Sequence, residues 1–479
     1  MNFSTIRYII GWILRFESFF MLLPALVGFL YQEKAGFAYL FVAMACFLLS
    51  YLLTAKKPAS KELYLKDGFI VVALGWIVMS LFGALPFTLS GDIPSYVDAL
   101  FEAVSGFTTT GASILADVES ISHASLIWRS FSHWIGGMGV FVFIMAVLPL
   151  FGGSTMNMMK AESTGPSVDK LVPRVKNTAK ILYGIYIFMT ILQTVILVLL
   201  DMPLFEAMCT SFGTTGTGGF GFKNDSFASF SPAIQLTVAV FMILSGVNYS
   251  MYFLILRRKI KQAFSLEEVW WYFGIIGVAT LLIFMKIKDL YPTLEEGLRH
   301  SIFQVGAIIT STGYATTDYN LWPPFASMCL IVLMFIGACA GSTGGGIKVS
   351  RIIILAKSIK KEISSIAHPQ EVSKIRLNGH PVSHEVIRST NVFLSIYLLL
   401  LIGTTLLISI DGQNFTTNFT AVVATLNNTG PGLDMVGPTG NFGFFSNLSK
   451  LVLIFNMLAG RLELFPILLL LFPVSYRKH

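Results

Sequence analysis

The feature that most constrains this chain is a series of apolar segments long enough to cross a lipid bilayer as helices. A helix rises ~1.5 Å per residue, so crossing ~30 Å of hydrocarbon takes about 20 residues. Ten segments qualify, at residues 8–30, 36–53, 68–90, 126–150, 181–200, 232–256, 269–285, 324–347, 389–410 and 451–475. Only 12% of the residues are charged, against roughly 25% in soluble globular domains. The sequence therefore excludes a water-soluble monomer and predicts an all-α integral membrane protein embedded in a lipid bilayer.

The positions of the basic residues predict how the spans are oriented. Most of the 33 lysines and arginines lie at the two ends of the chain and in residues 54–67, 155–180, 257–268 and 348–388. Cytoplasmic loops carry such an excess, so we predict that these segments and both termini are cytoplasmic. The net charge of +7 then reflects topology. We expect no nucleic-acid partner, because that would require a basic face or a binding module outside the membrane.

After the first two spans, the outward-facing connections contain an internal repeat. Each connection joins a pair of spans and holds a short apolar stretch followed by a run of small residues. The runs are Thr108–Ala112, Gly216–Phe220, Thr310–Tyr314 and Asn427–Pro431. Irregular backbone at membrane depth must be buried in protein or line a water-filled cavity. We therefore predict four re-entrant half-helices that return as extended chain around one axis, with Pro94, Pro203 and Pro292 near the start of three of them.

The residue types in these runs predict a cation site. Removing water from a cation requires several oxygens at short range, and successive carbonyls of an extended chain supply them. Glycine permits the backbone angles and the close approach, and the C-terminus of a half-helix adds a negative partial charge. One such turn alone is usually a loop, whereas four copies on the same membrane side favour a filter. Acidic residues at its mouth would concentrate cations: Asp98, Asp117, Glu119, Asp225, Asp318 and Asp434.

A glycine-rich stretch interrupts the eighth apolar segment. Residues 337–346 contain five glycines together with Ser342 and Thr343, and each interior glycine costs a helix roughly 1 kcal/mol relative to alanine. We predict that the helix breaks there, leaving a loop within the membrane that can obstruct a pore below the filter. The alternative is close helix packing through small residues, which is common in membranes.

Enzymatic and nucleotide-binding functions are disfavoured by what the sequence lacks. A phosphate-binding loop requires Gly-Lys-Ser/Thr after a strand, whereas Ile347 precedes Lys348, Val349 follows it, and no βαβ pattern surrounds it. The chain also has no paired intramembrane aspartates, no His-Glu-x-x-His helix and no nucleophile–base pair that would indicate a membrane-embedded enzyme. We therefore predict that the protein is not an enzyme.

Charged residues inside the predicted spans need an explanation, because charge in a span is costly and normally faces a partner or a water-filled interior. The tenth segment carries Arg461 and Glu463, and Arg461 either faces the water-filled interior or forms a structural ion pair with Glu463 or another acid. Arg129 and His133 begin the fourth segment, and we interpret them as interfacial or packing residues. The basic connection 348–388 is either a docking surface or a solvated loop.

Three stretches together resemble the TrkH/KtrB family of potassium-uptake proteins: Ser105–Gly111, Gly337–Lys348 and Asn427–Leu433. The likeness covers about residues 68–475, and residues 1–53 resemble the additional two-helix unit of the TrkH branch. The resemblance implies four pseudo-symmetric helix–pore-helix–helix repeats around one ion pore, with K+ as the transported ion. It also implies a homodimer and a cytosolic nucleotide-binding regulatory ring of the TrkA/KtrA type as a partner.

The resemblance also implies the functional residues and the division of the chain. The candidate filter residues are Thr109, Thr110, Gly111, Thr217, Gly218, Gly219, Ser311, Thr312, Gly313, Asn428, Thr429 and Gly430. The candidate gate residues are Gly337, Gly341, Ser342, Thr343, Gly344, Gly345, Gly346, Lys348 and Arg461. Arg461 is expected below the filter, as a barrier to K+ that contacts the gating loop. The expected units are an N-terminal two-helix unit at 1–67 and pore repeats at 68–160, 161–260, 261–370 and 371–479.

The resulting prediction is gated K+ uptake across a bacterial inner membrane. In the second repeat, Gly216, Gly218 and Gly219 compete for the filter glycine, and only the resemblance favours Gly219, which precedes Phe220. In the fourth repeat, Asn427 and Asn428 replace the threonines of the first. Because that wall is asymmetric, Na+ leakage would be unsurprising. K+ transport coupled to Na+ or H+, or a less selective K+/Na+ pathway, is the alternative function on the same fold.

Overall fold

Helices make up most of the chain that the computed structural model describes, which comprises residues 3–58, 65–137, 139, 175–370 and 374–472. The longer helices are α1 (Phe3–Phe20), α3 (Ala35–Thr54), α4 (Leu65–Ser90), α9 (Val175–Leu199), α14 (Glu267–Ile287), α17 (Val349–Ala367) and α18 (His384–Ile408). Shorter ones are α2 (Leu22–Leu30), α6 (His123–Gly137), α11 (Pro232–Ser245), α12 (Tyr249–Leu256), α13 (Ile260–Ala263), α16 (Pro324–Ile336), α20 (Asn447–Arg461) and α21 (Phe465–Leu471). Two short strands, β1 (Arg376–Leu377) and β2 (His380–Pro381), form an antiparallel hairpin.

Four further helices are the predicted half-helices, and each lies between two of the helices above. They are α5 (Tyr96–Phe107), α10 (Leu204–Thr215), α15 (Leu294–Ile309) and α19 (Phe415–Leu426). Ser95, Thr293 and Asn414 cap three of them through side-chain oxygens that accept a backbone N–H bond from the first turn. Pro203 occupies the same N-cap position of α10. This proline therefore lies just outside the helix and fixes the direction in which the chain enters it.

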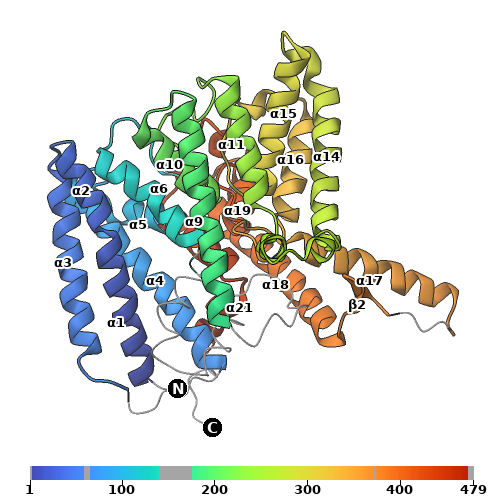
Figure 1. The fold of residues 1–479 in the computed structure, drawn as a ribbon, viewed down its shortest axis with the longest axis horizontal. Helices are drawn as coiled ribbons and strands as arrows, with labels where there is room; N and C mark the ends of the chain where they lie inside the picture. Colours follow the sequence, from blue (N-terminus) through green and yellow to red (C-terminus); the bar gives the residue numbers. More distant parts are fainter. Residues whose placement is uncertain (1–2, 59–64, 138, 140–174, 371–373, 473–479) are drawn as a thin grey trace.

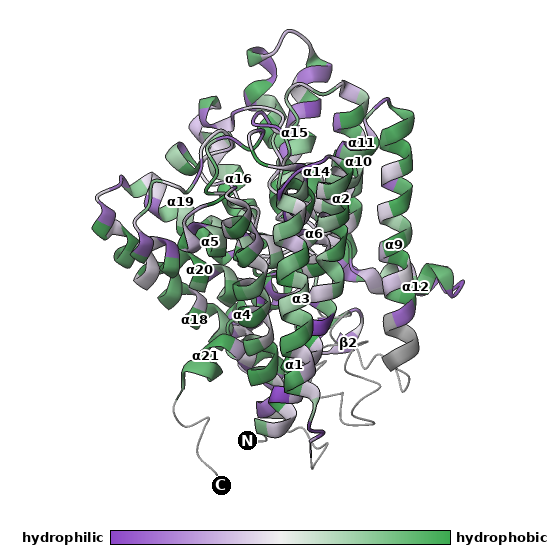
Figure 2. Cartoon of the chain, turned by 90° about the vertical axis from the view of Figure 1, so that its left-hand side faces the viewer, coloured by the Kyte–Doolittle hydropathy of each residue, from purple (hydrophilic) through white to green (hydrophobic). Residues whose placement is uncertain are grey.

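Among the residues that the structure describes, six helical segments are long and apolar enough to cross a bilayer, with α1 and α2 counted together. They confirm the spans predicted at 8–30, 36–53, 68–90, 181–200, 269–285 and 389–410. Figure 2 shows hydrophobic colour along α1, α3 and α9, with hydrophilic colour concentrated at turns and helix ends. Helix α3 exposes a set of large apolar side chains, as expected for a surface in contact with lipid: Phe37, Phe41, Met44, Phe47, Leu48, Tyr51 and Leu52.

The span predicted at 232–256 is not one unbroken helix. Helices α11 and α12 are separated by three residues and their axes differ by 87°. The Asn248 side chain accepts a hydrogen bond from the Ser250 N–H at 2.9 Å, which starts a new helix. At the bend, Gly246 leaves room for the Tyr272 hydroxyl, which would lie 2.4 Å from an added Cβ. The apolar run is continuous although the helix is not.

Two other predicted spans are divided into helices shorter than a bilayer. Helices α16 and α17 are separated by the glycine-rich segment, so the predicted break in the eighth span is present. Helices α20 and α21 are separated at Glu463 and Leu464, which adopt left-handed backbone with φ of 55° and 68°. Helix α6 is described as far as Gly137, and residues 138 and 140–150 of the span predicted at 126–150 lie outside the described residues.

The helices form four repeats of outer helix, pore helix and inner helix, namely α4–α5–α6, α9–α10–α11, α14–α15–α16 and α18–α19–α20. Each pore helix packs against the inner helix of the preceding repeat, in the pairs α10–α6, α15–α11, α19–α16 and α5–α20. The last pair returns to the first repeat, so the arrangement closes into a ring. In Figure 1, helices α1–α3 lie outside the ring on one side, the repeat α14–α16 forms the opposite side of the ring, and α19 lies between them.

Glycines allow inner helices α6 and α20 to approach the ends of the pore helices. A Cβ added at Gly136 would lie 1.8 Å from the Phe107 carbonyl oxygen at the end of α5. One added at Gly460 would lie 2.1 Å from the Leu426 carbonyl oxygen at the end of α19. Real atoms do not approach so closely, so any side chain at these positions would push the pore helix outward.

We expect Gly136→Ala to destabilise the protein by about 1–3 kcal/mol, because overpacking at a backbone contact forces the helices apart. The measurement is the midpoint of thermal unfolding in detergent. Gly184→Ala is the matched control, since that helical glycine on α9 has no atom within 4 Å of an added Cβ. If the Gly136→Ala protein were as stable as the Gly184→Ala protein, the contact between Gly136 and α5 would not have the expected importance for stability.

Candidate functional site

The four pore helices end in the same hydrogen-bonded cap. In α5, the Thr110 N–H donates to the Ser105 carbonyl at 2.9 Å and the Thr109 N–H donates to the Gly106 carbonyl at 3.1 Å. This is the Schellman pattern, which places the residue after the C-cap in left-handed backbone. The equivalent residues adopt φ values of 53° to 56°: Thr109, Thr217, Ser311 and Asn428. None is glycine, so each carries backbone strain of roughly 1–2 kcal/mol.

Beyond each cap, four glycines meet around one axis. Gly111, Gly219, Gly313 and Gly430 have φ of 80°, 81°, 80° and 92°. An added Cβ at each would touch the carbonyl oxygen that precedes the next glycine in the ring. The distance from the added Cβ to this oxygen is 2.0 Å for Gly111 and the Gly218 oxygen, and 1.5 Å for Gly219 and the Thr312 oxygen. It is 2.3 Å for Gly313 and the Thr429 oxygen, and 2.7 Å for Gly430 and the Thr110 oxygen. The contacts run through all four repeats and return to the first.

This geometry identifies the glycine of the second repeat that is equivalent to the others. Gly219 has the positive φ of the ring glycines, and Thr217 has the left-handed φ of the capping residues. Gly216 takes the place of the C-cap residue. The backbone therefore brings all twelve candidate filter residues to equivalent positions in four extended segments.

Side-chain oxygens add to the backbone carbonyls near this ring. The hydroxyl oxygens of Thr109 and Thr429 and the amide oxygen of Asn428 are buried without a hydrogen-bond partner in the described structure. The Asn428 amide nitrogen donates to the Thr110 hydroxyl and to the Met457 carbonyl, both at 2.9 Å. In the first and third repeats, the threonine hydroxyls pair within their own segment at 2.8 Å. The backbone thus has approximate fourfold symmetry, whereas the hydrogen bonds of the side chains differ between repeats.

The glycine-rich loop at residues 337–348 lies directly against two pore-helix ends. The Gly345 N–H donates to the Ser311 hydroxyl at 2.5 Å. A Cβ at Gly344 would lie 2.8 Å from the Thr310 carbonyl, and one at Gly345 would lie 2.2 Å from the Asn427 carbonyl. Within the loop, the buried Lys348 ammonium group donates to the Gly344 carbonyl.

Arg461 joins this loop to the inner end of the first repeat. Its guanidinium donates to the Thr343 carbonyl at 2.8 Å and to the Gly136 and Gly137 carbonyls at 2.5 and 3.2 Å. Glu463, two residues later, forms an ion pair with Arg351 of α17. Arg461 therefore contacts both the loop and α6 in this conformation.

Glu268 is a further residue of the loop region that sequence reasoning missed. This buried carboxylate of α14 accepts bonds from the Ala340 N–H at 2.7 Å and the Ser350 N–H at 3.1 Å. It also accepts from the Asn248 amide at 3.4 Å. Glu268 belongs to the segment 257–268 that was predicted to be a cytoplasmic loop, and its partners lie far along the chain, so no local signal identified it.

Arg129 and His133 are also closer to the filter than predicted. Both are buried, so the interfacial interpretation is wrong and the packing interpretation is confirmed. Arg129 forms an ion pair with Glu102 of α5 at 2.7 Å. His133 contacts Gly106 and Phe220, which flank the candidate filter in two different repeats.

Most of the acidic residues expected at the mouth connect outer segments to one another. Asp117 and Glu119 accept bonds from the Asn224 side chain and N–H at 2.8 and 3.0 Å, linking the first two repeats. Asp98 forms an ion pair with Lys450 at 2.5 Å. These acids therefore have a structural role in the outer face in addition to their charge.

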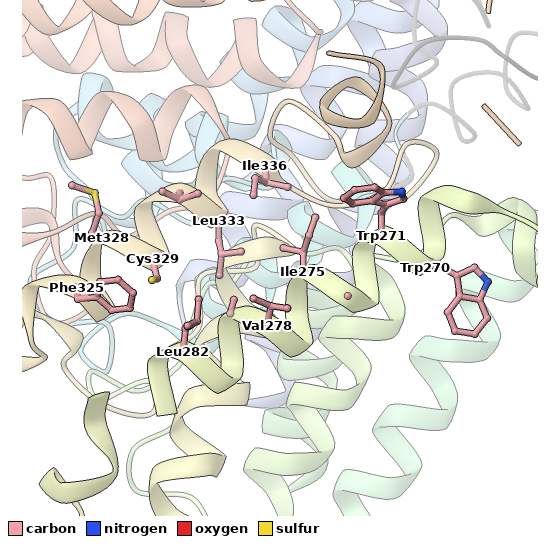
Figure 3. Close-up of a pocket in the computed structure, with 13 residues that line it drawn as sticks. Trp270, Trp271, Ile275, Val278, Leu282, Phe325, Met328, Cys329, Leu333 and Ile336 are labelled. Atoms are coloured by element: carbon pink, nitrogen blue, oxygen red, sulfur yellow. The ribbon is translucent and has the colours of Figure 1, made fainter. Parts of the chain in front are cut away.

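A separate groove of about 730 Å³ lies between α14 and α16. Figure 3 shows the side chains of Ile275, Val278, Leu282 and Leu333 gathered there, with Trp270 at one end. Its lining is almost entirely apolar, and none of the candidate filter or gate residues lines it. Such a surface does not offer the oxygens that a cation needs.

Comparisons with known proteins agree on one family. The chain matches the TrkH family, described as cation transport proteins, over residues 36–291 and 291–475. The Trk system potassium uptake protein TrkH is 37% identical in Salmonella typhimurium and 36% identical in Escherichia coli, each alignment covering 100% of both chains. The crystal structure of the potassium transporter TrkH from Vibrio parahaemolyticus superimposes with a TM-score of 0.90 at 33% identity over 100% of both chains.

We expect Gly219→Ala to abolish cation binding at the ring, because the added Cβ would lie 1.5 Å from the Thr312 carbonyl oxygen. The measurement is the K+-dependent rise in the midpoint of thermal unfolding, which reports binding to the folded state. Gly91→Ala is the control: its φ of 84° imposes the same strain, but an added Cβ has open space. Equal K+-dependent shifts in the two variants would argue against the ring as the binding site.

Proposed function

Because the chain belongs to the TrkH family of cation transport proteins, we propose that it carries potassium ions into the cell across the bacterial inner membrane. The observation that carries this proposal is the closed ring of carbonyl oxygens and glycines contributed by four segments of one chain. Relatives matched over their full length are named potassium uptake proteins.

The candidate filter residues would act mainly through their backbone. A K+ ion entering the ring exchanges its water for carbonyl oxygens held by the extended segments. The four pore-helix C-termini contribute negative partial charge at the same place. Because no carboxylate belongs to the ring, the ion is held by dipoles and can leave again. The amide side chains of Asn427 and Asn428 favour the less selective K+/Na+ pathway as the second candidate function.

The loop at residues 337–348 would act as the gate. Its contacts with Ser311, Thr310 and Asn427 put backbone atoms against the inner ends of two pore helices. Arg461 adds a positive charge and holds the loop through the Thr343 carbonyl. A cation that has passed the ring then meets both an obstruction and a like charge.

Partners and orientation complete the proposal. Both termini would be cytoplasmic, as the distribution of basic residues indicates. The described start of α1 and helix α21 lie at the same end of the molecule in Figures 1 and 2, which supports this orientation. The family resemblance further suggests a homodimer and a cytosolic nucleotide-binding ring that regulates the gate.

The central test is ion flux into liposomes that contain only the purified protein, under opposed K+ and Na+ gradients. We expect K+ uptake with a preference over Na+ that falls about tenfold in Gly313→Ser, equivalent to ~1.4 kcal/mol. The reason is that the new Cβ meets the Thr429 carbonyl at 2.3 Å. Gly412→Ser, at a φ of 73° in open space, should leave the preference unchanged. An unaltered preference in Gly313→Ser would contradict the filter assignment.

A second test addresses the gate. We expect Arg461→Ala to raise K+ flux several-fold, which corresponds to lowering the barrier by ~1 kcal/mol. The reason is that the loop loses a hydrogen bond and that the positive charge repelling the K+ ion is removed. Arg257→Ala, at the exposed end of α12, is the control and should leave flux unchanged. Unchanged or reduced flux in a folded Arg461→Ala protein would count against the barrier role.

A further inference from the structure

The second repeat differs from the other three at the residue before the ring glycine. Thr110, Thr312 and Thr429 occupy this position in three repeats, whereas the second repeat has Gly218. The position is buried in the threonine-bearing repeats, so their side chains fill space behind the filter. A glycine here would leave a void unless another group occupied that space.

The imidazole of His133 occupies it. A Cβ added at Gly218 would lie 2.1 Å from Cγ and 2.2 Å from Nδ1 of His133. His133 comes from α6, in the first repeat, and its ring is fully buried. The missing side chain of one repeat is therefore replaced by a side chain from its neighbour, and a threonine at 218 cannot coexist with this histidine.

The hydrogen bonds of His133 fix both ring nitrogens. Nε2 accepts the Phe220 N–H at 3.1 Å, so Nε2 carries no proton. Nδ1 lies 2.8 Å from the Gly106 carbonyl oxygen, which can only accept, so Nδ1 carries the proton. The neutral ring thus joins the last turn of α5 to the residue that follows the ring glycine of the second repeat.

Arg129, one helical turn before His133, holds the same segment from the side. Its guanidinium donates to the Gly221 carbonyl at 3.1 Å and lies 4.1 Å from the centre of the Phe220 ring. Glu102 balances its charge and also accepts from Ser113 and the Ile114 N–H of the first repeat. Two residues of α6 therefore attach the outgoing chain of the second repeat to the first.

We propose that His133 is a positioning residue for ion selectivity, which supplies in the second repeat the support that a threonine supplies in the others. It sets the Gly218 and Gly219 carbonyls by holding Phe220 against α5. This proposal rests on the proposed function, because it assumes that these carbonyls contact the transported ion. A similar fixed support behind a site commonly decides how accurately its ligands are held.

The test compares three kinds of variant by K+/Na+ preference in liposomes. His133→Phe keeps an aromatic ring but has neither hydrogen-bonding atom, and His133→Gln retains one donor and one acceptor. Gly218→Thr introduces the side chain of the other repeats against the existing ring. The double variant His133→Ala with Gly218→Thr exchanges the two groups, and His133→Ala alone supplies the second single variant of that comparison. Tyr39→Phe is the control, since it keeps an aromatic ring and removes a buried hydrogen bond to Ser125 of α6 from α3, a helix outside the four repeats.

We expect His133→Phe and Gly218→Thr each to lower the K+/Na+ preference about tenfold (~1.4 kcal/mol), and His133→Gln to lower it less. The double variant should have a higher K+/Na+ preference than Gly218→Thr alone. Such a non-additive result is diagnostic of two residues in contact. A His133→Phe protein with the K+/Na+ preference of Tyr39→Phe at equal thermal stability would overturn the proposal. The proposal would also be overturned if the K+/Na+ preference of the double variant were no higher than the two single variants, His133→Ala and Gly218→Thr, predict when their effects are multiplied.

A second readout separates failure of this proposal from failure of the proposed function. The difference between the K+- and Na+-dependent shifts in thermal unfolding reports selective binding without transport. If the wild-type protein shows this difference and His133→Phe loses it, the positioning role stands even where flux is low. If the wild-type protein shows neither a K+-dependent shift nor K+ flux, the proposed function itself fails, and the positioning role with it.

Discussion

The whole arrangement depends on the carbonyl oxygens of Thr110, Gly218, Thr312 and Thr429, which accept no hydrogen bond from the residues that the structure describes. In hydrocarbon, an unsatisfied backbone group costs several kcal/mol, so extended chain is tolerated there only with a substitute partner. Four extended segments meet so closely that only glycine fits at their crossing points. A bare cation is the natural complement of such a cluster. The Schellman caps, the strained left-handed residues and the glycine contacts of α6 and α20 all serve to hold these oxygens in place.

The backbone repeats four times, but each repeat is supported differently. The first uses the buried ion pair between Glu102 and Arg129, and the second uses the His133 ring. The fourth uses the Asn428 amide, which reaches across to Thr110. In the third, Gln304 occupies the position of Glu102, nine residues before the ring glycine, and its buried amide has no hydrogen-bond partner in the described structure. Equivalent backbone geometry therefore does not require equivalent side chains.

Local sequence patterns predicted the fold well where one segment carries all the information. Six spans followed from apolar length alone, and the break at residues 337–346 followed from the density of glycine. The 87° bend between α11 and α12 could not be predicted from hydropathy, because Asn248 and Gly246 interrupt the helix without interrupting the apolar run. The contacts of Glu268, Arg129 and His133 could not be predicted for another reason: their partners are distant in sequence, and only the folded chain brings them together. Gly218 was the one available signal for His133, as an unexplained departure from threonine.

A pore assembled from four identical subunits changes all of its walls whenever one codon changes. Here the ring comes from four different stretches of a single polypeptide, so a substitution touches one wall and leaves three intact. The exchange of a threonine for a glycine and a neighbouring histidine is the kind of step that this covalent linkage permits. Ion selectivity in such a protein can therefore be adjusted at one segment while the other three keep their side chains.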